Sequence, residues 1–441
     1  MSSVALLAEE LRVALGSDLV RAGAGLERYR LGCLVPQAAA LPGSEAEVAR
    51  VLRFASEAAL GVVPWGHGTF QGIGLPPARY DLALDLTRLD RLVAHEPADM
   101  TATAQAGLPF AALQSRLAEH GQFLPLDPPL AQASTLGGLL ATRSSGPLRC
   151  RYGTARDLVL GLRIAHPDGT VTRAGASVVK NATGYDLTKL HLGAHGTLGV
   201  ILEATLRVYP RPDLERAWWI TGADALLLQE VASRILTSHL VPDRVEYADA
   251  PAARAWGAPV EGPALCVSIG GMRESVEGQA VDLRRIVEEQ GAALRDAGTG
   301  AEAWAPSGDF PWNLRAQGES ACWAVWRGGV PPAESVPALA ALRQAVPPPS
   351  EMAGAATVAQ GTLRGIFRGP SAAHVVQALA AGREALAPGG GYLVLLDAPP
   401  RVRDGVDPWG VSPGGLDVMR RLKRAFDPGS VLNPGRFVGG I

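Results

Sequence analysis

The chain has 441 residues, too many for one ordinary hydrophobic core, so we expect two or three domains. Hydrophobic residues make up 47% of it and charged residues 19%, which is typical of a compact globular protein and excludes a largely disordered one. The formal net charge of −2, with no long basic run, argues against nucleic acid as a partner.

The cysteines and the N-terminus indicate which metal sites and which cellular compartment to expect. The four cysteines are widely spaced, and no CxxC or clustered Cys/His set signals an iron–sulfur cluster or any other metal site. Scattered thiols suit a reducing compartment. The first residues lack the basic start and apolar centre of a signal peptide, and no apolar run approaches the ~20 residues that span a bilayer. We therefore expect a cytoplasmic protein that meets a membrane only through a partner.

The first 60 residues predict two helices separated by a turn. Ser44 can cap the second helix, with Glu47 as its capping-box partner. A short strand at 62–64 then enters the loop WGHGTFQG (65–72), whose successive backbone N–H groups can form an anion nest suited to a phosphate. The loop is neither a Walker loop nor a GxGxxG motif, and a plain surface loop is the alternative.

Two more glycine-rich stretches follow. In STLGGLLATRSSG (134–146), the pair Gly137-Gly138 could let backbone meet a flat ligand. Residues 178–201 place glycines at 184, 193, 196 and 199 among buried-type apolar residues, unlike a flexible linker. We interpret this stretch as backbone holding a buried ligand; a tight connection in an α/β core is the alternative.

Residues 211–400 alternate strands and helices in a pattern that occurs twice, which predicts an α+β domain with an antiparallel sheet. The expected strands lie at 217–220, 244–247, 264–269, 320–327, 362–367 and 391–396, and the expected helices at 225–238, 274–290, 335–345 and 371–386. We thus expect a first domain at 1–210 and a second at 211–400. Residues 401–441, with a helix near 414–426, are too few for a domain and should pack back on the first one.

Four motifs in order resemble the flavin-binding proteins of the vanillyl-alcohol oxidase (PCMH) type. They are VPWGHGT (63–69), Pro129 with STLGG (134–138) and SGP (145–147), KNATGYDL (180–187) with GTLGVI (196–201), and finally FDP (426–428) with NPGR (433–436). The resemblance implies an α+β fold in which FAD lies between two α+β subdomains under a ferredoxin-like α+β cap.

The same resemblance implies which residues bind FAD. They are Pro64, Trp65, Gly66, His67, Gly68, Thr69, Phe70, Pro129, Ser134, Thr135, Gly137, Gly138, Ser145, Gly146, Lys180, Asn181, Gly184, Tyr185, Asp186, Gly196, Thr197, Gly199, Val200, Ile201, Asn433 and Arg436. Some relatives attach FAD covalently through a histidine in the first loop. Thr69 stands where that histidine is expected, so we expect noncovalent FAD with His67 packed near it.

Within this family, the segment VVKNATGYDLTKL (178–190) most resembles the FAD-binding subunits of bacterial glycolate oxidases. That likeness implies oxidation of a small 2-hydroxy acid, glycolate or D-lactate, with electrons passed through flavin to a separate iron–sulfur subunit beside a second flavoprotein subunit. Two alternatives remain: a catalytically silent structural or electron-relay subunit of such a complex, or a stand-alone FAD-dependent oxidase of another hydroxy substrate.

Oxidising a 2-hydroxy acid needs a cation for the carboxylate and a base for the hydroxyl proton. Arg327 and Arg364 are the candidates for the carboxylate, because the planar guanidinium makes paired charge-assisted bonds. Tyr185, His191 or His195 is the candidate base. Relatives carry a histidine-rich strand in the cap, but the corresponding residues 358–364 contain no histidine, which leaves the catalytic site incomplete on sequence grounds.

Overall fold

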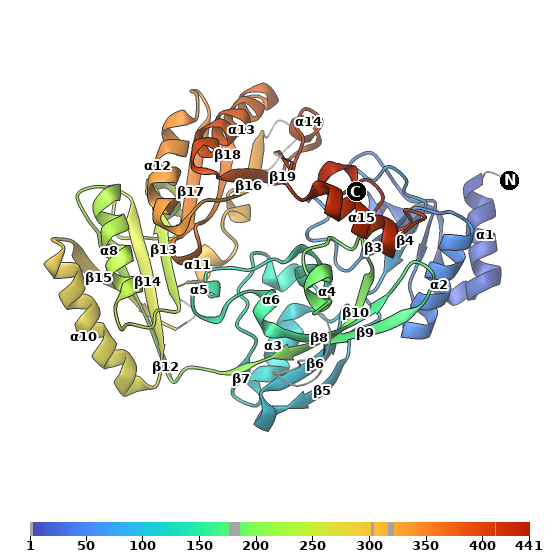
Figure 1. The fold of residues 1–441 in the computed structure, drawn as a ribbon, viewed down its shortest axis with the longest axis horizontal. Coiled ribbons are helices and arrows are strands. Elements are labelled where there is room, and N and C mark those ends of the chain that lie inside the picture. Colours follow the sequence, from blue (N-terminus) through green and yellow to red (C-terminus); the bar gives the residue numbers. More distant parts are fainter. Residues whose placement is uncertain (1–2, 176–185, 301–303, 316–321, 411) are drawn as a thin grey trace.

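The computed structural model describes residues 3–175, 186–300, 304–315, 322–410 and 412–441. Figure 1 shows two lobes side by side: residues 3–211 with helix α15 (Leu416–Phe426) form one, and the strands and helices from 214 to 397 form the other. None of the described helices is long and apolar enough to cross a membrane.

The first lobe contains two sheets. A four-stranded sheet has the order β1-β2-β4-β3, with β1 (Val20–Arg21) antiparallel to β2 (Ala38–Ala40) and the pairs β2/β4 (Leu82–Asp85) and β3 (Val62–Trp65)/β4 parallel. A five-stranded antiparallel sheet has the order β5-β6-β10-β8-β9. Its strands are β5 (Leu92–Glu96), β6 (Thr101–Gln105), β10 (Val200–Arg207), β8 (Val159–Ala165) and β9 (Val171–Gly175).

Helix α2 (Glu45–Glu57) covers the smaller sheet together with α1 (Ser3–Leu15). The Ser44 hydroxyl accepts the Glu47 N–H (3.3 Å), as predicted, but the Glu47 carboxylate accepts the N–H of Gly43 (2.7 Å), one residue earlier than a capping box requires. The predicted apolar face of α2 is buried against β2 and β4. Helices α3 (Phe110–Ala118) and α4 (Leu136–Thr142) pack on the larger sheet.

The second lobe, called the cap below, is built on one antiparallel sheet of eight strands, ordered β15-β12-β14-β13-β17-β18-β16-β19. It consists of two βαββαβ halves that meet at β13/β17. The first half is β12 (Leu214–Thr221), α8 (Ala225–Thr237), β13 (Arg244–Ala248), β14 (Ala264–Gly271), α10 (Arg273–Glu289) and β15 (Ala293–Thr299). The second is β16 (Trp323–Gly329), α12 (Ser335–Ala345), β17 (Glu351–Thr357), β18 (Thr362–Arg368), α13 (Ala372–Leu386) and β19 (Tyr392–Asp397).

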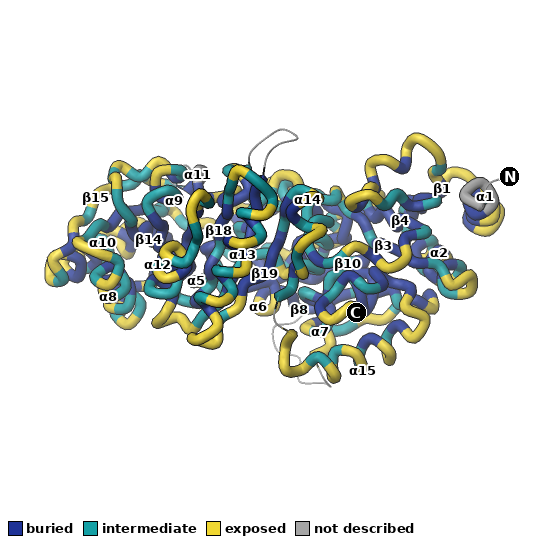
Figure 2. The backbone as a smooth tube through the Cα atoms, turned by 90° about the horizontal axis from the view of Figure 1, so that it is seen from above, coloured by how far each residue is buried: buried dark blue, intermediate teal, exposed yellow. Residues whose placement is uncertain are grey.

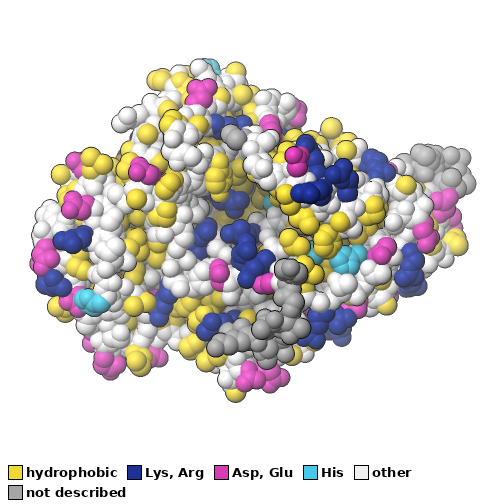
Figure 3. All heavy atoms as spheres, viewed as in Figure 1, with side chains coloured by type: hydrophobic (Ala, Val, Ile, Leu, Met, Phe, Trp, Pro, Cys, Tyr) yellow, Lys and Arg dark blue, Asp and Glu magenta, His cyan; other side chains and the backbone are white. Residues whose placement is uncertain are grey.

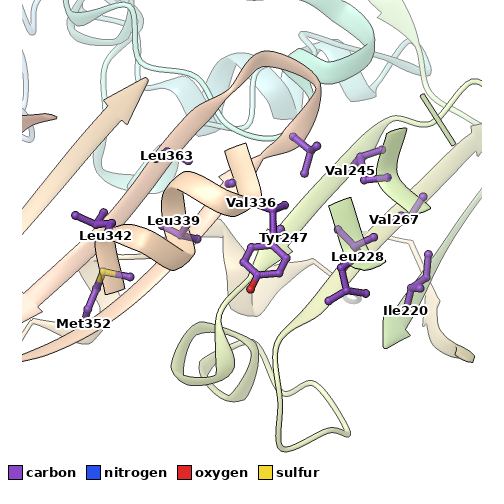
Figure 4. Packing of buried hydrophobic residues seen from close by; sticks show 14 of the residues in the cluster. Ile220, Leu228, Val245, Tyr247, Val267, Val336, Leu339, Leu342, Met352 and Leu363 are labelled. Carbon is purple, nitrogen blue, oxygen red and sulfur yellow. The ribbon is translucent and has the colours of Figure 1, made fainter. Parts of the chain in front are cut away.

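The two faces of the cap sheet differ. The four helices cover one face and bury the largest apolar cluster; Figure 4 shows side chains such as Leu228, Val245, Leu339 and Leu363 meeting there. The opposite face turns to the first lobe, because its apolar residues share a cluster with Phe70 of the glycine-rich loop 65–72. The expected α+β fold with an antiparallel, ferredoxin-like cap is confirmed.

Two strands of the cap escaped prediction, and the stretch matched to the relatives' histidine-rich strand is a strand only in part. Edge strand β15 is mostly exposed and β17 consists largely of alanine and glycine, so neither has a strong strand pattern. The histidine-free stretch 358–364 is not one strand: Val358–Gln360 form a 3-10 turn and β18 begins only at Thr362.

The C-terminal segment packs on the first lobe, and Figure 2 shows the largely exposed helix α15 at the edge of that lobe. Residues after α15 lie along the free edge of β3: the N–H of Val62 donates to the carbonyl of Val431 (2.7 Å), and that of Asn433 to the carbonyl of Val62 (2.8 Å). Buried Lys423 donates to the carbonyls of Thr197 (2.9 Å) and Leu432 (2.8 Å).

Candidate functional site

A cavity lies where the glycine-rich segments of the first lobe converge. It encloses about 950 Å³ of empty space, counting the part open to solvent, a size typical of ligand sites. Its lining contains Pro64, Trp65, Gly66, His67, Gly68, Thr69, Phe70, Gln71, Ile73, Leu86, Ala106, Ser134, Thr135, Gly137, Gly138, Ala141, Thr142, His191, His195, Gly196, Gly199, Val200, Ile201, Asn433 and Arg436.

The loop after β3 is held by its own side chains. The indole N–H of buried Trp65 donates to the Tyr80 hydroxyl (2.8 Å). Gly68 has φ +82°, and a Cβ there would come within 2.6 Å of the Trp65 ring, so the loop folds tightly over that ring. The Thr69 hydroxyl donates to the carbonyl of Ala133 (2.6 Å), and His67 Nδ1 lies 3.2 Å from the same oxygen. These contacts fix the loop against residues 131–133.

Two polar residues of the C-terminal segment position the loops that line the cavity. The buried Arg436 guanidinium donates to the side chain (2.5 Å) and carbonyl (2.7 Å) of Gln71 and to the carbonyl of Ile73 (3.1 Å). Asn433 Nδ2 donates to the carbonyl of His195 (2.6 Å). Burial lowers the pKa of Arg436 to about 10. Both side chains therefore hold the loops around the cavity that they also line.

The two adjacent glycines of α4 differ in what surrounds them. A Cβ on Gly137 would lie 2.7 Å from the Cβ of Ala106, so that glycine permits close packing of protein on protein. A Cβ on Gly138 would meet only the Thr135 hydroxyl, at 3.3 Å, although Gly138 lines the cavity. Gly199 resembles Gly137, with Ile164 at 2.6 Å. The open side of Gly138 is the kind of surface that a flat ring system can cover.

The structure gathers most of the FAD-binding residues expected from sequence around this cavity. Pro129, Ser145, Gly146, Asp186 and Thr197 do not line it. Asp186 pairs with Lys189 (2.8 Å), and the Thr197 hydroxyl donates to the carbonyl of Ala194 (2.7 Å). The predicted residues Lys180, Asn181, Gly184 and Tyr185 lie outside the described residues.

Sequence reasoning on FAD missed Gln71, Ile73, Leu86, Ala106, Ala141, Thr142, His191 and His195 among the lining residues, and named the two histidines only as candidate bases. Ala141 and Thr142 lie one helical turn beyond Gly137 and Gly138, so the helical period was a usable signal. Leu86 and Ala106 follow β4 and β6, and only the tertiary fold brings them here.

His191 is buried and His195 half-buried, in surroundings that disfavour the imidazolium form. Burial, and then the charges of Arg327 and Arg436, lower the pKa of His195 to about 3. Burial also lowers the pKa of His191 to about 4, and its Nδ1 has no hydrogen-bond partner among the described residues. Both imidazoles are neutral at pH 7, and such low pKa values make them poor proton acceptors there.

Two arginines of the cap face the first lobe. Arg327 on β16 and Arg364 on β18 stand directly opposite each other across the strand pair. Arg364 donates to the fully buried carboxylate of Glu246 (2.5 Å) and lies over the Trp256 ring (5.5 Å). Arg327 makes no ion pair within the described part of the chain, and its buried Nε has no hydrogen-bond partner there. Figure 3 shows Lys and Arg side chains gathered in the hollow between the lobes.

Two family models match the chain: "FAD binding domain" over residues 36–175 and "FAD linked oxidases, C-terminal domain" over residues 408–437. Among curated relatives, a mitochondrial D-lactate dehydrogenase [cytochrome] of Arabidopsis thaliana is 38% identical over 40% of this chain and 31% of its own. Glycolate oxidase subunit GlcE of Escherichia coli is 37% identical over 34% of this chain and 42% of its own. The chain thus matches less than half the length of either relative.

Longer matches are more distant. An uncharacterized FAD-linked oxidoreductase of Mycobacterium tuberculosis is 28% identical over 92% of this chain and 91% of its own. The structure of p-cresol methylhydroxylase with substrate bound superposes with a TM-score of 0.79 at 18% identity, covering 99% of this chain and 97% of that one, which shows a shared fold. Together with the cavity, whose open Gly138 face fits a flat ring, these findings show an FAD-binding domain and an FAD-linked oxidase C-terminal domain on a PCMH-type fold, with FAD as the cofactor.

Proposed function

We propose that the chain is the FAD-binding subunit of a glycolate oxidase-type complex and oxidises a small 2-hydroxy acid, glycolate or D-lactate, to the 2-oxo acid. The observation that carries the proposal is Arg327, a half-buried cation beside the FAD cavity without an acidic partner among the described residues. A guanidinium in that position suits the carboxylate of a small acid. The names of the two relatives with the higher identity support the same substrate class.

The roles of this chain's residues follow from the site. The lining residues hold FAD, which supplies the hydride acceptor when bound. Arg327 binds the carboxylate and so orients the carbon that carries the hydroxyl. The hydroxyl proton needs an acceptor: Tyr185 lies outside the described residues, and Oε1 of Glu246 is buried without a donor among them. We assign Arg364 to holding Glu246 in place rather than to the substrate.

The electrons must then leave the flavin. The sequence has no CxxC or clustered cysteines, so in this proposal they pass to a separate iron–sulfur subunit, beside a second flavoprotein subunit. The complex would lie in the cytoplasm, in contact with the membrane only through a partner.

Anaerobic mixing of the FAD-loaded chain with glycolate or D-lactate tests the proposal. Bleaching of the flavin band within seconds is the expected result, since a hydride from the substrate reduces the flavin. The lack of histidine at 358–364 favours a second candidate, a silent electron-relay subunit. Bleaching that occurs only after partner subunits are added would support that candidate and overturn the first.

A further inference from the structure

A second, half-buried arginine, from the first lobe, lies close enough to Arg327 for the two charges to interact. Arg149 begins the short helix α5 (Arg149–Tyr152), which contacts β13 of the cap. Its Nε is buried and, like Nε of Arg327, has no hydrogen-bond partner among the described residues. Sequence analysis gave no sign of this residue, because it lies in none of the flavin motifs.

The charges of the two arginines act against each other, and Glu246, an acidic group that partly offsets the charge of Arg149, forms its ion pair with Arg364 instead. Burial, then the charge of Arg327, then that of Arg143, lower the pKa of Arg149. Neither Arg149 nor Arg327 has an ion pair with any residue that the structure describes. The neighbouring arginines differ: Arg151 has Asp243 (2.6 Å) and Arg244 has Asp127 (3.2 Å). Because a cation without a counter-ion is unfavourable inside a protein, two of them near each other favour a bound anion.

The backbone places the two arginines on opposite walls of one junction. Gln360, in the turn between β17 and β18, donates through Nε2 to the carbonyl of Arg149 (3.2 Å), so the lobes touch here. Oε1 of Gln360 is buried and has no donor among the described residues. Arg327 also lies close enough to the FAD cavity to depress the pKa of His195, so the junction adjoins the flavin site.

We infer that Arg149 and Arg327 bind one carboxylate between them, one guanidinium from each lobe, so that the acid bridges the FAD-binding domain and the cap. This rests on the proposed function, because the carboxylate is that of the 2-hydroxy acid. A carboxylate has two oxygens and can accept from two guanidinium groups at once, which makes Arg149 a residue that determines specificity for acids. The unpaired acceptor of Gln360 suits a hydroxyl on the same ligand.

The test measures binding without turnover. Oxalate, a carboxylate probe with no hydroxyl to oxidise, is titrated into the FAD-loaded chain and followed by the change in flavin absorbance and by calorimetry. Arg149→Gln and Arg327→Gln should each weaken oxalate binding about 10- to 100-fold, the effect of losing one charge-assisted contact. Because both hold one anion, the double variant should lose less than the product of the two factors. Arg156→Gln removes a charge from an exposed arginine nearby and should bind like the wild type.

Three results would overturn the inference. Oxalate affinity in Arg149→Gln equal to that in Arg156→Gln would exclude Arg149 from the site. Loss of FAD together with oxalate binding would show that Arg149 holds the flavin instead. If Arg149→Gln fails to fold, Arg149→Lys replaces it: the charge stays and the planar fork is lost, and unchanged oxalate affinity there would also contradict the inference. Oxalate binding that depends on both arginines, in a chain whose flavin glycolate does not bleach, would overturn the proposed function and leave this site standing.

Discussion

The two halves of the cap share one topology but treat the charges that face the first lobe differently. At the first half, Arg244 and Asp243 each have an opposite charge across the junction, Asp127 and Arg151 respectively. At the second half, Arg327 has none among the described residues, and it faces Arg149, another cation. Burial alone therefore does not reveal what a charged residue does. The paired charges hold the cap to the first lobe, and in the proposed site the unpaired ones bind a ligand.

Removing a paired charge from the first half of the cap should give the largest loss of stability. Arg244, 10% exposed, binds both Asp127 and Glu215, so Arg244→Ala leaves two half-buried carboxylates without this partner and should lower the free energy of unfolding by about 3 kcal/mol. Arg327→Ala strands no carboxylate within the described structure and should cost less than about 1 kcal/mol. Urea unfolding followed by tryptophan fluorescence compares the two, with Arg234→Ala on the exposed side of α8 as the control. Equal losses of unfolding free energy for Arg244→Ala and Arg327→Ala would contradict this difference between the two halves of the cap.

The two adjacent glycines of α4 also differ in their surroundings: Gly137 packs against protein, and Gly138 faces open space. Gly138→Val should give folded protein, because little protein surrounds its Cβ, but should weaken FAD binding by about 1–3 kcal/mol, or roughly 5- to 150-fold. Gly137→Val, the matched control, should instead destabilise the fold against Ala106. Flavin absorbance per protein and thermal unfolding separate the outcomes. A Gly138→Val protein with full flavin content would show that this face does not meet FAD.

The loss of stability at acid pH should depend on the charge of Arg327, because that charge helps to lower the pKa of His195. The pKa of His195 is about 3 in the folded chain and ordinarily about 6.5 when unfolded, so between these values the unfolded state binds more protons. The stability of the flavin-free protein should fall as pH drops below 6.5, by up to roughly 1.4 kcal/mol per pH unit from this group. His191, with a pKa of about 4, adds to the same trend.

Two variants isolate this contribution. His195→Asn, which tolerates the residue's φ of +53°, removes the group, and Arg327→Gln should raise its pKa by removing a neighbouring charge. Both should show a shallower loss of stability than the wild type in urea titrations from pH 7 to 5. Parallel curves for all three proteins would mean that His195 does not report on Arg327.

The smallest effect is expected at His67. Its side chain is exposed and shares the carbonyl of Ala133 with Thr69, whose hydroxyl makes the shorter bond. His67→Ala should therefore keep its flavin, and acid precipitation should release flavin into the supernatant from variant and wild type alike. Yellow colour in the wild-type pellet but not in the His67→Ala pellet would reveal a covalent link and reverse this expectation.

The sequence predicted elements that depend on interactions between neighbouring residues, and it missed those that depend on contacts between residues far apart in the chain. The glycine-rich loops and α2 follow local rules, and the repeated strand–helix pattern of the cap was sufficient to predict an α+β domain with an antiparallel sheet. Strands β15 and β17 escaped because their pairing, and not their composition, makes them strands.

The roles of the arginines were out of reach for a related reason. Arg364 and Arg327 looked equivalent in the sequence, and only the contact with Glu246, 118 residues away, separates them. Arg149 lies in no motif, and its proposed role depends on its interaction with Arg327 of the opposite lobe. Arg436 lines the cavity, and the sequence did not indicate that it also holds the loop at Gln71 and Ile73.

The closure of β3 by residues 431–433 has a consequence for how the protein is made. Arg436 reaches Gln71 across 365 positions of sequence, so at ordinary translation rates the ribosome needs roughly 20–70 s to supply the partner of a loop it has already released. Until then the outer edge of β3 is an unpaired strand edge, open to chaperones or to pairing with another chain. We expect nascent chains that end before residue 431 to emerge without flavin, so that loading of the cofactor is among the last steps of biosynthesis.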